Sequence, residues 1–173
     1  MNNEKTFAFV KVTENPVEDF LKRFFLSDME LLNLIIITPI MGSLSGRRFS
    51  VERLKEKIDT ERIPTYIITR EPQDDFHIEA INILMDSDFV EVRYNNSLHA
   101  KLYICMGRDS GFALLGSGNL TQTSIEKNIE IGMLIFHHDK GKQILRELYH
   151  WGSVRLRTLK ESKVVKRITY ERR

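Results

Sequence analysis

A histidine and a lysine two positions apart are the residues of this chain best suited to chemistry. His99 and Lys101 lie in the stretch LHAKLYI, where they alternate with apolar residues. Such alternation predicts a strand with one apolar face and a second face that carries His99, Lys101 and Tyr103. Histidine can act as a nucleophile or a proton donor near neutral pH. Because polar residues on a strand usually just face water, this pair needs support from elsewhere in the sequence.

Two further polar segments follow it, GSGN at residues 116–119 and NIE at residues 128–130. Each of them alone is typical of an ordinary turn. However, polar groups at strand ends and in the turns after them can converge on one edge of a sheet. The order and spacing of the three segments therefore favour a shared site.

Together the three segments resemble the signature of the phospholipase D superfamily, which reads His-x-Lys, then Gly-Ser-x-Asn, then Asn-x-Glu. Three longer stretches, LIIITPIMGS, TYIITR and LLGSGNLTQTSIEKNIEIGMLI, also resemble strands and loops of that family. The resemblance thus covers most of the chain, from residue 31 to residue 151. It implies a phospholipase D-like fold and an enzyme that hydrolyses phosphodiester bonds.

The resemblance assigns a role to each motif residue. His99 would attack phosphorus and form a covalent phosphohistidine, while Glu130 would accept a hydrogen bond from the other ring nitrogen and fix the tautomer. Lys101 and Asn119, assisted by Ser117, would hold the non-bridging phosphate oxygens, where charge develops in the transition state. No metal or other cofactor is implied, because lysines would supply the positive charge.

Only one copy of the signature is present. The chemistry needs a second histidine as the general acid for the leaving oxygen, and family members with one copy obtain it from a second subunit. A two-fold axis through the site would place two copies of His99 and of Lys101 around one phosphate. The resemblance therefore implies an obligate homodimer with a single composite active site.

One position departs from the family pattern. Met106 stands where the motif has an aspartate, and Asp109 lies three residues later. A restriction-endonuclease branch of the family lacks that aspartate and shares the other spacings. We therefore expect a restriction-type endonuclease domain that acts on DNA, although the sequence does not separate DNA from RNA. Nothing obvious in the sequence reads bases, so specificity would need a separate domain or subunit.

Two alternatives stay open. A non-catalytic DNA-binding or dimerisation module would keep the same fold and bind DNA without cutting it. A phospholipid phosphodiesterase would be expected to have two motif copies or a membrane anchor. The longest apolar run, LLNLIIITPIM, is too short to cross a bilayer. We therefore expect no membrane partner.

Other residues are weaker candidates. Arg47 and Arg48, in a loop after an expected strand, are predicted either to contact backbone phosphates or simply to face solvent. His137 and His138 are neighbours on a strand and point to opposite faces, so we predict no metal site there. Cys105, the only cysteine, is expected to be a buried apolar residue.

Strand and helix patterns alternate along the chain. We expect strands near residues 7–12, 32–39, 65–70, 88–94, 98–106, 111–118 and 129–137, and helices near residues 16–25, 51–59, 75–87 and 140–151. This order predicts an α/β fold, with a mixed, largely parallel sheet flanked by helices on both faces.

Composition and charge describe an ordinary globular protein. The 173 residues are 42% hydrophobic and carry a net charge of +2. That charge is uneven, since residues 151–173 carry +6 and the remainder −4. We expect a catalytic domain over residues 1–151 and a basic tail or linker over residues 152–173, which could hold a polyanion. Without a signal-peptide pattern, we expect a cytoplasmic protein.

Overall fold

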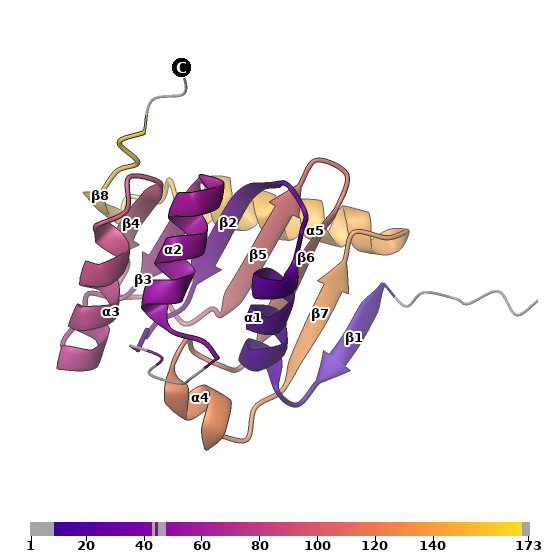
Figure 1. The fold of residues 1–173 in the computed structure, drawn as a ribbon, viewed down its shortest axis with the longest axis horizontal. Helices are drawn as coiled ribbons and strands as arrows, with labels where there is room; N and C mark the ends of the chain where they lie inside the picture. The colour runs from indigo at the N-terminus through magenta and orange to yellow at the C-terminus, as the bar shows by residue number, and fades with distance from the viewer. Residues whose placement is uncertain (1–8, 43, 45–47, 171–173) are drawn as a thin grey trace, which may run out of the picture.

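A computed structural model of the chain describes residues 9–42, 44 and 48–170 and contains one sheet with helices on both faces (Figure 1). The strands are β1 (Val10–Thr13), β2 (Leu31–Ile37), β3 (Thr65–Thr69), β4 (Val90–Tyr94), β5 (Leu102–Gly107), β6 (Gly111–Gly116), β7 (Gly132–Phe136) and β8 (Lys163–Lys166). The helices are α1 (Pro16–Leu26), α2 (Val51–Glu61), α3 (Asp75–Met85), α4 (Gln122–Glu126), α5 (Lys140–His150) and the π-helical turn η1 (Trp151–Leu156).

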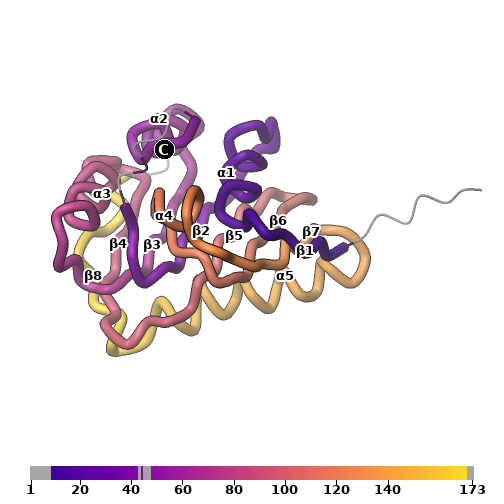
Figure 2. The backbone as a smooth tube through the Cα atoms, turned by 90° about the horizontal axis from the view of Figure 1, so that it is seen from below, coloured from indigo at the N-terminus to yellow at the C-terminus, as the bar shows by residue number. Residues whose placement is uncertain are grey.

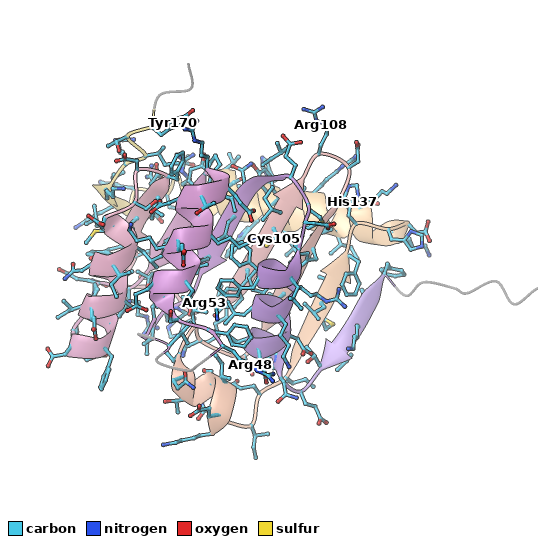
Figure 3. All side chains as sticks on the ribbon, viewed as in Figure 1. Arg48, Arg53, Cys105, Arg108, His137 and Tyr170 are labelled. Atoms are coloured by element: carbon cyan, nitrogen blue, oxygen red, sulfur yellow. The ribbon has the colours of Figure 1, made fainter. Side chains whose placement is uncertain are left out.

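The strands form a single mixed sheet in the order β1-β7-β6-β5-β2-β3-β4-β8. Strands β2, β3 and β4 are parallel, whereas the other neighbouring pairs among the described strands are antiparallel. The prediction of a mixed sheet is therefore confirmed, but the prediction that it is largely parallel is wrong. The reason is that β5 turns directly into β6 around Arg108 (Figure 3), and a short turn of this kind joins only antiparallel strands.

The sheet separates two layers of helices. Figure 2 shows α1, α2 and α3 on one face and α5 on the other. Side chains of β5 alternate between the two cores: Leu102 and Ile104 pack on the α5 side, and Tyr103 and Cys105 on the opposite side. Leu98 also packs in the α5-side core. The predicted alternation is thus confirmed from Leu102 onward, but β5 begins at Leu102 and not at Leu98, so His99 and Lys101 lie in the segment that precedes the strand.

Local sequence signals explain where the helices begin. Pro16, in the first turn of α1, lacks the backbone N–H that a first turn leaves unpaired. Ser50 and Asp74 cap α2 and α3 by accepting hydrogen bonds from backbone N–H groups in the first turn. Thr121 does the same for α4. None of the described helices is long and apolar enough to span a bilayer.

The C-terminal segment differs from the expected tail or linker. Helix α5 continues into η1, and β8 then pairs antiparallel with β4 at the end of the sheet. Within residues 152–170, therefore, the chain folds onto the domain. The sequence underestimates this because Lys163 and Lys166 flank only two apolar residues, and a short edge strand with charged residues lacks the pattern of a buried one.

Candidate active site

The motif segments meet at one end of the sheet, where β2 and β6 end and β5 and β7 begin. We call this end the site edge. Ile37 at the end of β2 lies opposite Leu102 at the start of β5, which in turn lies opposite Leu115 near the end of β6. Gly116 lies opposite Gly132 at the start of β7. Residues 99–101, 116–119 and 128–130 are therefore next to one another where these strands begin or end. In Figure 1 this is the edge of the sheet next to α4.

His99 and Lys101 lie in the segment that leads into β5. The side chain of His99 is exposed, and that of Lys101 is half-buried. Lys101 Nζ donates a hydrogen bond to the His99 carbonyl at 3.2 Å. The Lys101 carbonyl accepts from the Gly116 N–H at 3.3 Å. This second bond holds the His99 segment against the GSGN segment.

Arg70 carries no sequence signal, yet its guanidinium lies beside His99. Arg70 Nη2 is 3.1 Å from each ring nitrogen of His99, and Arg70 Nε donates to the Leu98 carbonyl at 2.7 Å. The backbone N–H of Arg70 donates to the Pro39 carbonyl at 3.2 Å, which fixes Arg70 just beyond the ends of β2 and β3. Arg70 and His99 are 29 positions apart in the sequence, so only strand pairing brings them together.

Ser117, Asn128 and Glu130 form one hydrogen-bonded group between β6 and β7. The Ser117 hydroxyl donates to Glu130 Oε2 and accepts from the Ile131 N–H at 3.1 Å. Asn128 Nδ2 donates to Glu130 Oε1 at 3.2 Å. Both oxygens of the carboxylate are therefore engaged in closing this connection.

Asn119 is oriented from the end of β2. Thr38 is fully buried, and its hydroxyl is shared between Asn119 Oδ1 at 3.3 Å and the Ile40 carbonyl at 2.9 Å. The same hydroxyl accepts from the Leu120 N–H at 3.3 Å. Among the described residues, no partner accepts from Asn119 Nδ2. This amide group is thus a donor available to an anion at the site edge.

Tyr103 supports the GSGN segment from within the core. It is 1% exposed, and its hydroxyl donates to the Gly118 carbonyl at 2.8 Å. Burial raises the pKa of the Tyr103 hydroxyl far above its usual range, so this group remains a donor. Gly118 itself packs closely on α1, where an added Cβ would lie 2.7 Å from Val17 Cγ2. A side chain at position 118 would therefore displace the segment.

His99 and Glu130 are not hydrogen-bonded to each other in the described part of the chain. The ring of His99 contacts Arg70, whereas Glu130 accepts from Ser117 and Asn128. The expected bond that fixes the His99 tautomer is therefore not formed within one chain.

Of the weaker candidates, Arg47 lies outside the described residues. Arg48 is exposed on the side of the sheet that carries α1 and α2, where its carbonyl accepts from Arg53 Nη1 at 2.8 Å (Figure 3). Cys105 is fully buried, and burial raises the pKa of its thiol, as expected for a core residue.

No group of three His, Cys, Asp or Glu side chains within the described ranges is arranged to hold a metal ion. His137 and His138 are part of no such group. His138 Nε2 instead lies 3.2 Å from Asp139 Oδ2.

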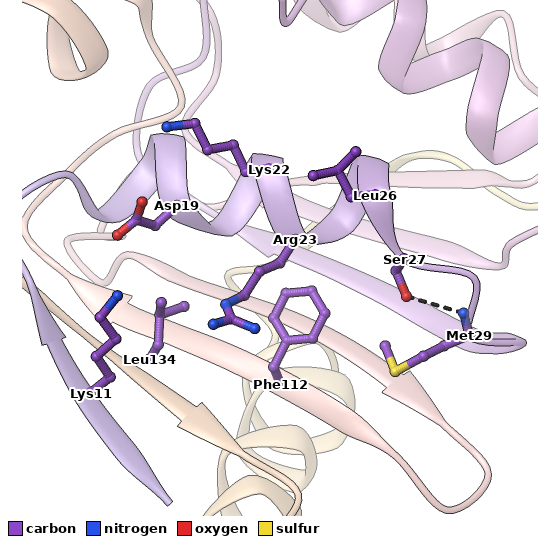
Figure 4. A pocket seen from close by; sticks show the side chains of 9 residues that line it. All are labelled: Lys11, Asp19, Lys22, Arg23, Leu26, Ser27, Met29, Phe112 and Leu134. Atoms are coloured by element: carbon purple, nitrogen blue, oxygen red, sulfur yellow. Dashed lines mark hydrogen bonds between the residues drawn. The ribbon is translucent and has the colours of Figure 1, made fainter. Parts of the chain in front are cut away.

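Two hollows help to define what the site edge can bind. One of about 320 Å³ adjoins Arg70 and is lined in part by Pro39, Ile40 and Asn96. The other, of about 470 Å³, lies between β1 and α1 beside Lys11 and shares no residue with the motif segments (Figure 4). Of the two, the first adjoins Arg70, which contacts His99.

The edge offers hydrogen-bond donors around one histidine. Arg70 and Lys101 are cations that form no ion pair with a described carboxylate, and Asn119 presents a neutral amide. Donors that are fixed in advance suit an anion such as a phosphate group, whose oxygens carry the negative charge during substitution at phosphorus.

The fold agrees with that of several solved structures. Nuc from Salmonella typhimurium, a phospholipase D family member, superposes with a TM-score of 0.61 over 91% of this chain and 97% of that chain, at 13% sequence identity. NucT from Helicobacter pylori gives 0.60 over 90% and 96%, at 14% identity. A phosphatidylserine synthase from Haemophilus influenzae gives 0.58 over 92% of this chain but only 40% of its own, at 17% identity.

These similarities confirm the predicted phospholipase D-like fold. No protein-family model matches the sequence, and neither does any curated protein. At these identities the likeness concerns the fold, so the activity must be argued from the site.

Proposed function

We propose that this chain is a metal-independent phosphodiesterase, specifically a restriction-type endonuclease domain that cuts DNA through a covalent phosphohistidine. The observation that carries the proposal is the convergence of His99, Lys101 and Asn119 on one edge of the sheet. The fold, shared over nearly the whole chain with the phospholipase D family member Nuc, supports it.

The reaction would proceed in two displacements. First, a ring nitrogen of His99 attacks phosphorus, and the bond from phosphorus to the leaving oxygen breaks as the new P–N bond forms. The leaving oxygen takes a proton from His99 of the partner subunit. Water then attacks phosphorus, the P–N bond breaks, and the proton from water passes to His99 of the partner subunit. Lys101 and Asn119 would donate to the non-bridging oxygens throughout.

Glu130 would act as a positioning residue in this scheme. Its bonds to Ser117 and Asn128 close the connection that also carries Asn119. Loss of the carboxylate would free this connection and lower the rate through the geometry of the donors, because small displacements of positioned groups are costly in catalysis.

An exposed apolar row beside the site supports the proposed homodimer. Val12, Met133 and Leu115 are cross-strand neighbours on β1, β7 and β6, and they are 61%, 42% and 36% exposed. Ile131, next to Glu130, is 61% exposed. Contiguous apolar surface of this kind is uncommon on a monomer and typical of an interface. We assign it to a second copy of this chain, because the reaction needs a second histidine.

The interface can be tested with Met133→Asp. A charge in the centre of the row should convert the dimer into a monomer in analytical ultracentrifugation and remove nuclease activity together with it. Lys11→Asp, on the other face of β1, is the matched control and should remain dimeric. A Met133→Asp protein that is monomeric and fully active would contradict the composite site.

Plasmid nicking in excess EDTA is the direct test of the function. We expect wild type to nick, and His99→Ala to be inactive, whereas His150→Ala, at the exposed end of α5, should be as active as wild type. Equal nicking by His99→Ala and wild type would exclude a histidine nucleophile. DNA binding without cleavage would favour the non-catalytic module, and headgroup release from phospholipid vesicles without DNA cleavage would favour the lipid enzyme.

A further inference from the structure

We propose that Arg70 is a phosphate-binding residue of this site and that, until phosphate binds, its guanidinium rests on the ring of His99, the residue that would attack. The inference deepens the proposed function and rests on it for the identity of the reacting phosphate. Its basis is the contact of His99 with Arg70, a residue outside the three motif segments.

The contact between Arg70 and His99 places the guanidinium over the imidazole ring. Arg70 Nη2 lies 3.1 Å from both ring nitrogens. An atom at this distance from both nitrogens cannot lie in the ring plane without clashing with the carbon between them, so Nη2 lies over the face of the ring. Arg70 therefore holds its donors beside the nitrogen that would attack phosphorus.

The anchoring of Arg70 allows its outer guanidinium to leave the ring of His99. Its backbone N–H is bonded to Pro39, and its Nε to the Leu98 carbonyl. The stem is thus fixed, while the Nη groups extend beyond it toward the exposed ring of His99. A hollow of about 320 Å³ adjoins the same side chain. A small shift of the outer guanidinium would exchange its contact with the ring of His99 for a bond to a phosphate oxygen.

The charge of Arg70 favours that exchange. Across the described residues, no carboxylate forms an ion pair with it, and its contacts are the imidazole ring of His99 and the Leu98 carbonyl. Charge-assisted bonds from arginine to phosphate are stronger than bonds to neutral acceptors. A phosphate that reaches this edge would therefore take the Nη donors, and His99 would become free only when a target is bound.

The test compares Arg70→Gln with Arg108→Gln, which removes the same charge from the exposed turn between β5 and β6. Histidine ring ¹⁵N resonances are recorded during titration with inorganic phosphate, and His99→Asn identifies the His99 signals among the five histidines. Cleavage kinetics of a DNA duplex are measured in parallel. Arg70→Lys keeps the positive charge but lacks the planar guanidinium and its fixed arrangement of donors.

We expect phosphate to shift the His99 resonances in wild type and Arg108→Gln, but not in Arg70→Gln. For cleavage, Arg70→Gln should lose about 10²-fold in kcat/KM, with Arg70→Lys in between, as for removal of a donor to a developing oxyanion. Arg108→Gln should match wild type.

The outcomes separate this inference from the proposed function. If wild type cleaves no phosphodiester but phosphate still shifts His99 in an Arg70-dependent manner, the function is wrong and the role of Arg70 in anion binding stands. If wild type cleaves DNA and Arg70→Gln is as active, the role of Arg70 is wrong and the function stands. A phosphate shift of His99 that persists in Arg70→Gln would also overturn the role of Arg70.

Discussion

Arginines lie toward both ends of the parallel strands β3 and β4, and they differ in what they contact. At the start of β4, Glu91 is 4% exposed and bonds to Arg93 Nε at 2.6 Å, and to Arg157 Nε at 2.6 Å and Nη2 at 2.9 Å. Beyond the end of β3, Arg70 contacts the ring of His99 and no carboxylate among the described residues.

The buried group is satisfied internally. Burial alone would raise the pKa of the Glu91 carboxyl, but the hydrogen bonds and charges of Arg157 and Arg93 outweigh it and hold this pKa below its usual value. The guanidinium of Arg157 also stacks on the Tyr66 ring, 4.4 Å from its centroid. Glu91, Arg93 and Arg157 are paired with one another, which indicates a structural role for this group.

The group at the site edge has the opposite character. Arg70, Lys101 and Asn119 present donors beside an exposed histidine, and the nearby carboxylate of Glu130 is engaged by Ser117 and Asn128. The lack of a described carboxylate partner for Arg70 and Lys101 costs little stability, because surface ion pairs contribute little to the free energy of unfolding. The comparison indicates that the partners of a charged side chain, more than its type, separate structural from functional arginines.

The largest expected effect is on stability and comes from removing Glu91, the centre of the buried group. Glu91→Ala leaves the partly buried Arg157 and Arg93 without their partner, and we expect the free energy of unfolding to fall by about 3–5 kcal/mol. Chemical denaturation followed by circular dichroism measures this. Glu52→Ala, at an exposed position of α2, should be close to wild type. A loss no larger for Glu91→Ala than for Glu52→Ala would contradict the structural role.

The next largest effect is expected on the rate of DNA cleavage, at the site edge. Lys101→Met should lower kcat for DNA cleavage by about 10²–10³-fold, since it removes a donor to the phosphate in the transition state. Its free energy of unfolding should change by no more than about 0.5 kcal/mol, as for most surface substitutions. Lys160→Met is the matched exposed control. Lys101→Met that unfolds easily but cleaves normally would reverse the assignment of the two groups.

A smaller effect is expected where core and site meet. Tyr103→Phe removes the donor to the Gly118 carbonyl, which should cost about 1–3 kcal/mol of unfolding free energy for a buried acceptor left unpaired. Because Gly118 precedes Asn119, cleavage should slow as well. Tyr170→Phe, at an exposed position, provides the control in both assays. Normal stability and normal cleavage in Tyr103→Phe would show that the hydrogen bond does not hold the GSGN segment.

The smallest expected effect is on how the free energy of unfolding depends on pH. Because the pKa of Glu91 is lowered in the folded protein, its contribution is present above the ordinary pKa of 4.5 and is lost as pH falls through the folded value. Wild type should therefore lose stability on acidification more steeply than Glu91→Gln. Unfolding free energies between about pH 3 and pH 7 test this. Parallel pH profiles for the two proteins would rule out the linkage.

Much of this fold follows from local patterns in the sequence. The alternation around His99 predicts which side chains of β5 enter each core, and Pro16 and Ser50 mark the starts of two helices correctly. Period-two alternation and helix capping involve only near neighbours in the chain, so they can be read without knowledge of the fold. The same holds for the motif segments at residues 99–101, 116–119 and 128–130.

Pairing between distant strands could not be predicted in this way. The sequence does not reveal that β8 joins the sheet beside β4, nor that most neighbouring strands are antiparallel, because both depend on how distant segments meet. The bonds of Glu130 to Ser117 and Asn128, instead of to His99, are likewise decided by which groups the packed connections bring within reach.

The sequence by itself therefore determined the types of the candidate site residues and their placement near strand ends. Only the tertiary structure decided that Arg70, 29 positions away, contacts His99. The physical reason is that β3 and β5 flank β2 on either side, so the end of β3 and the start of β5 meet at one edge of the sheet. A contact made across an intervening strand leaves no periodic trace in the sequence.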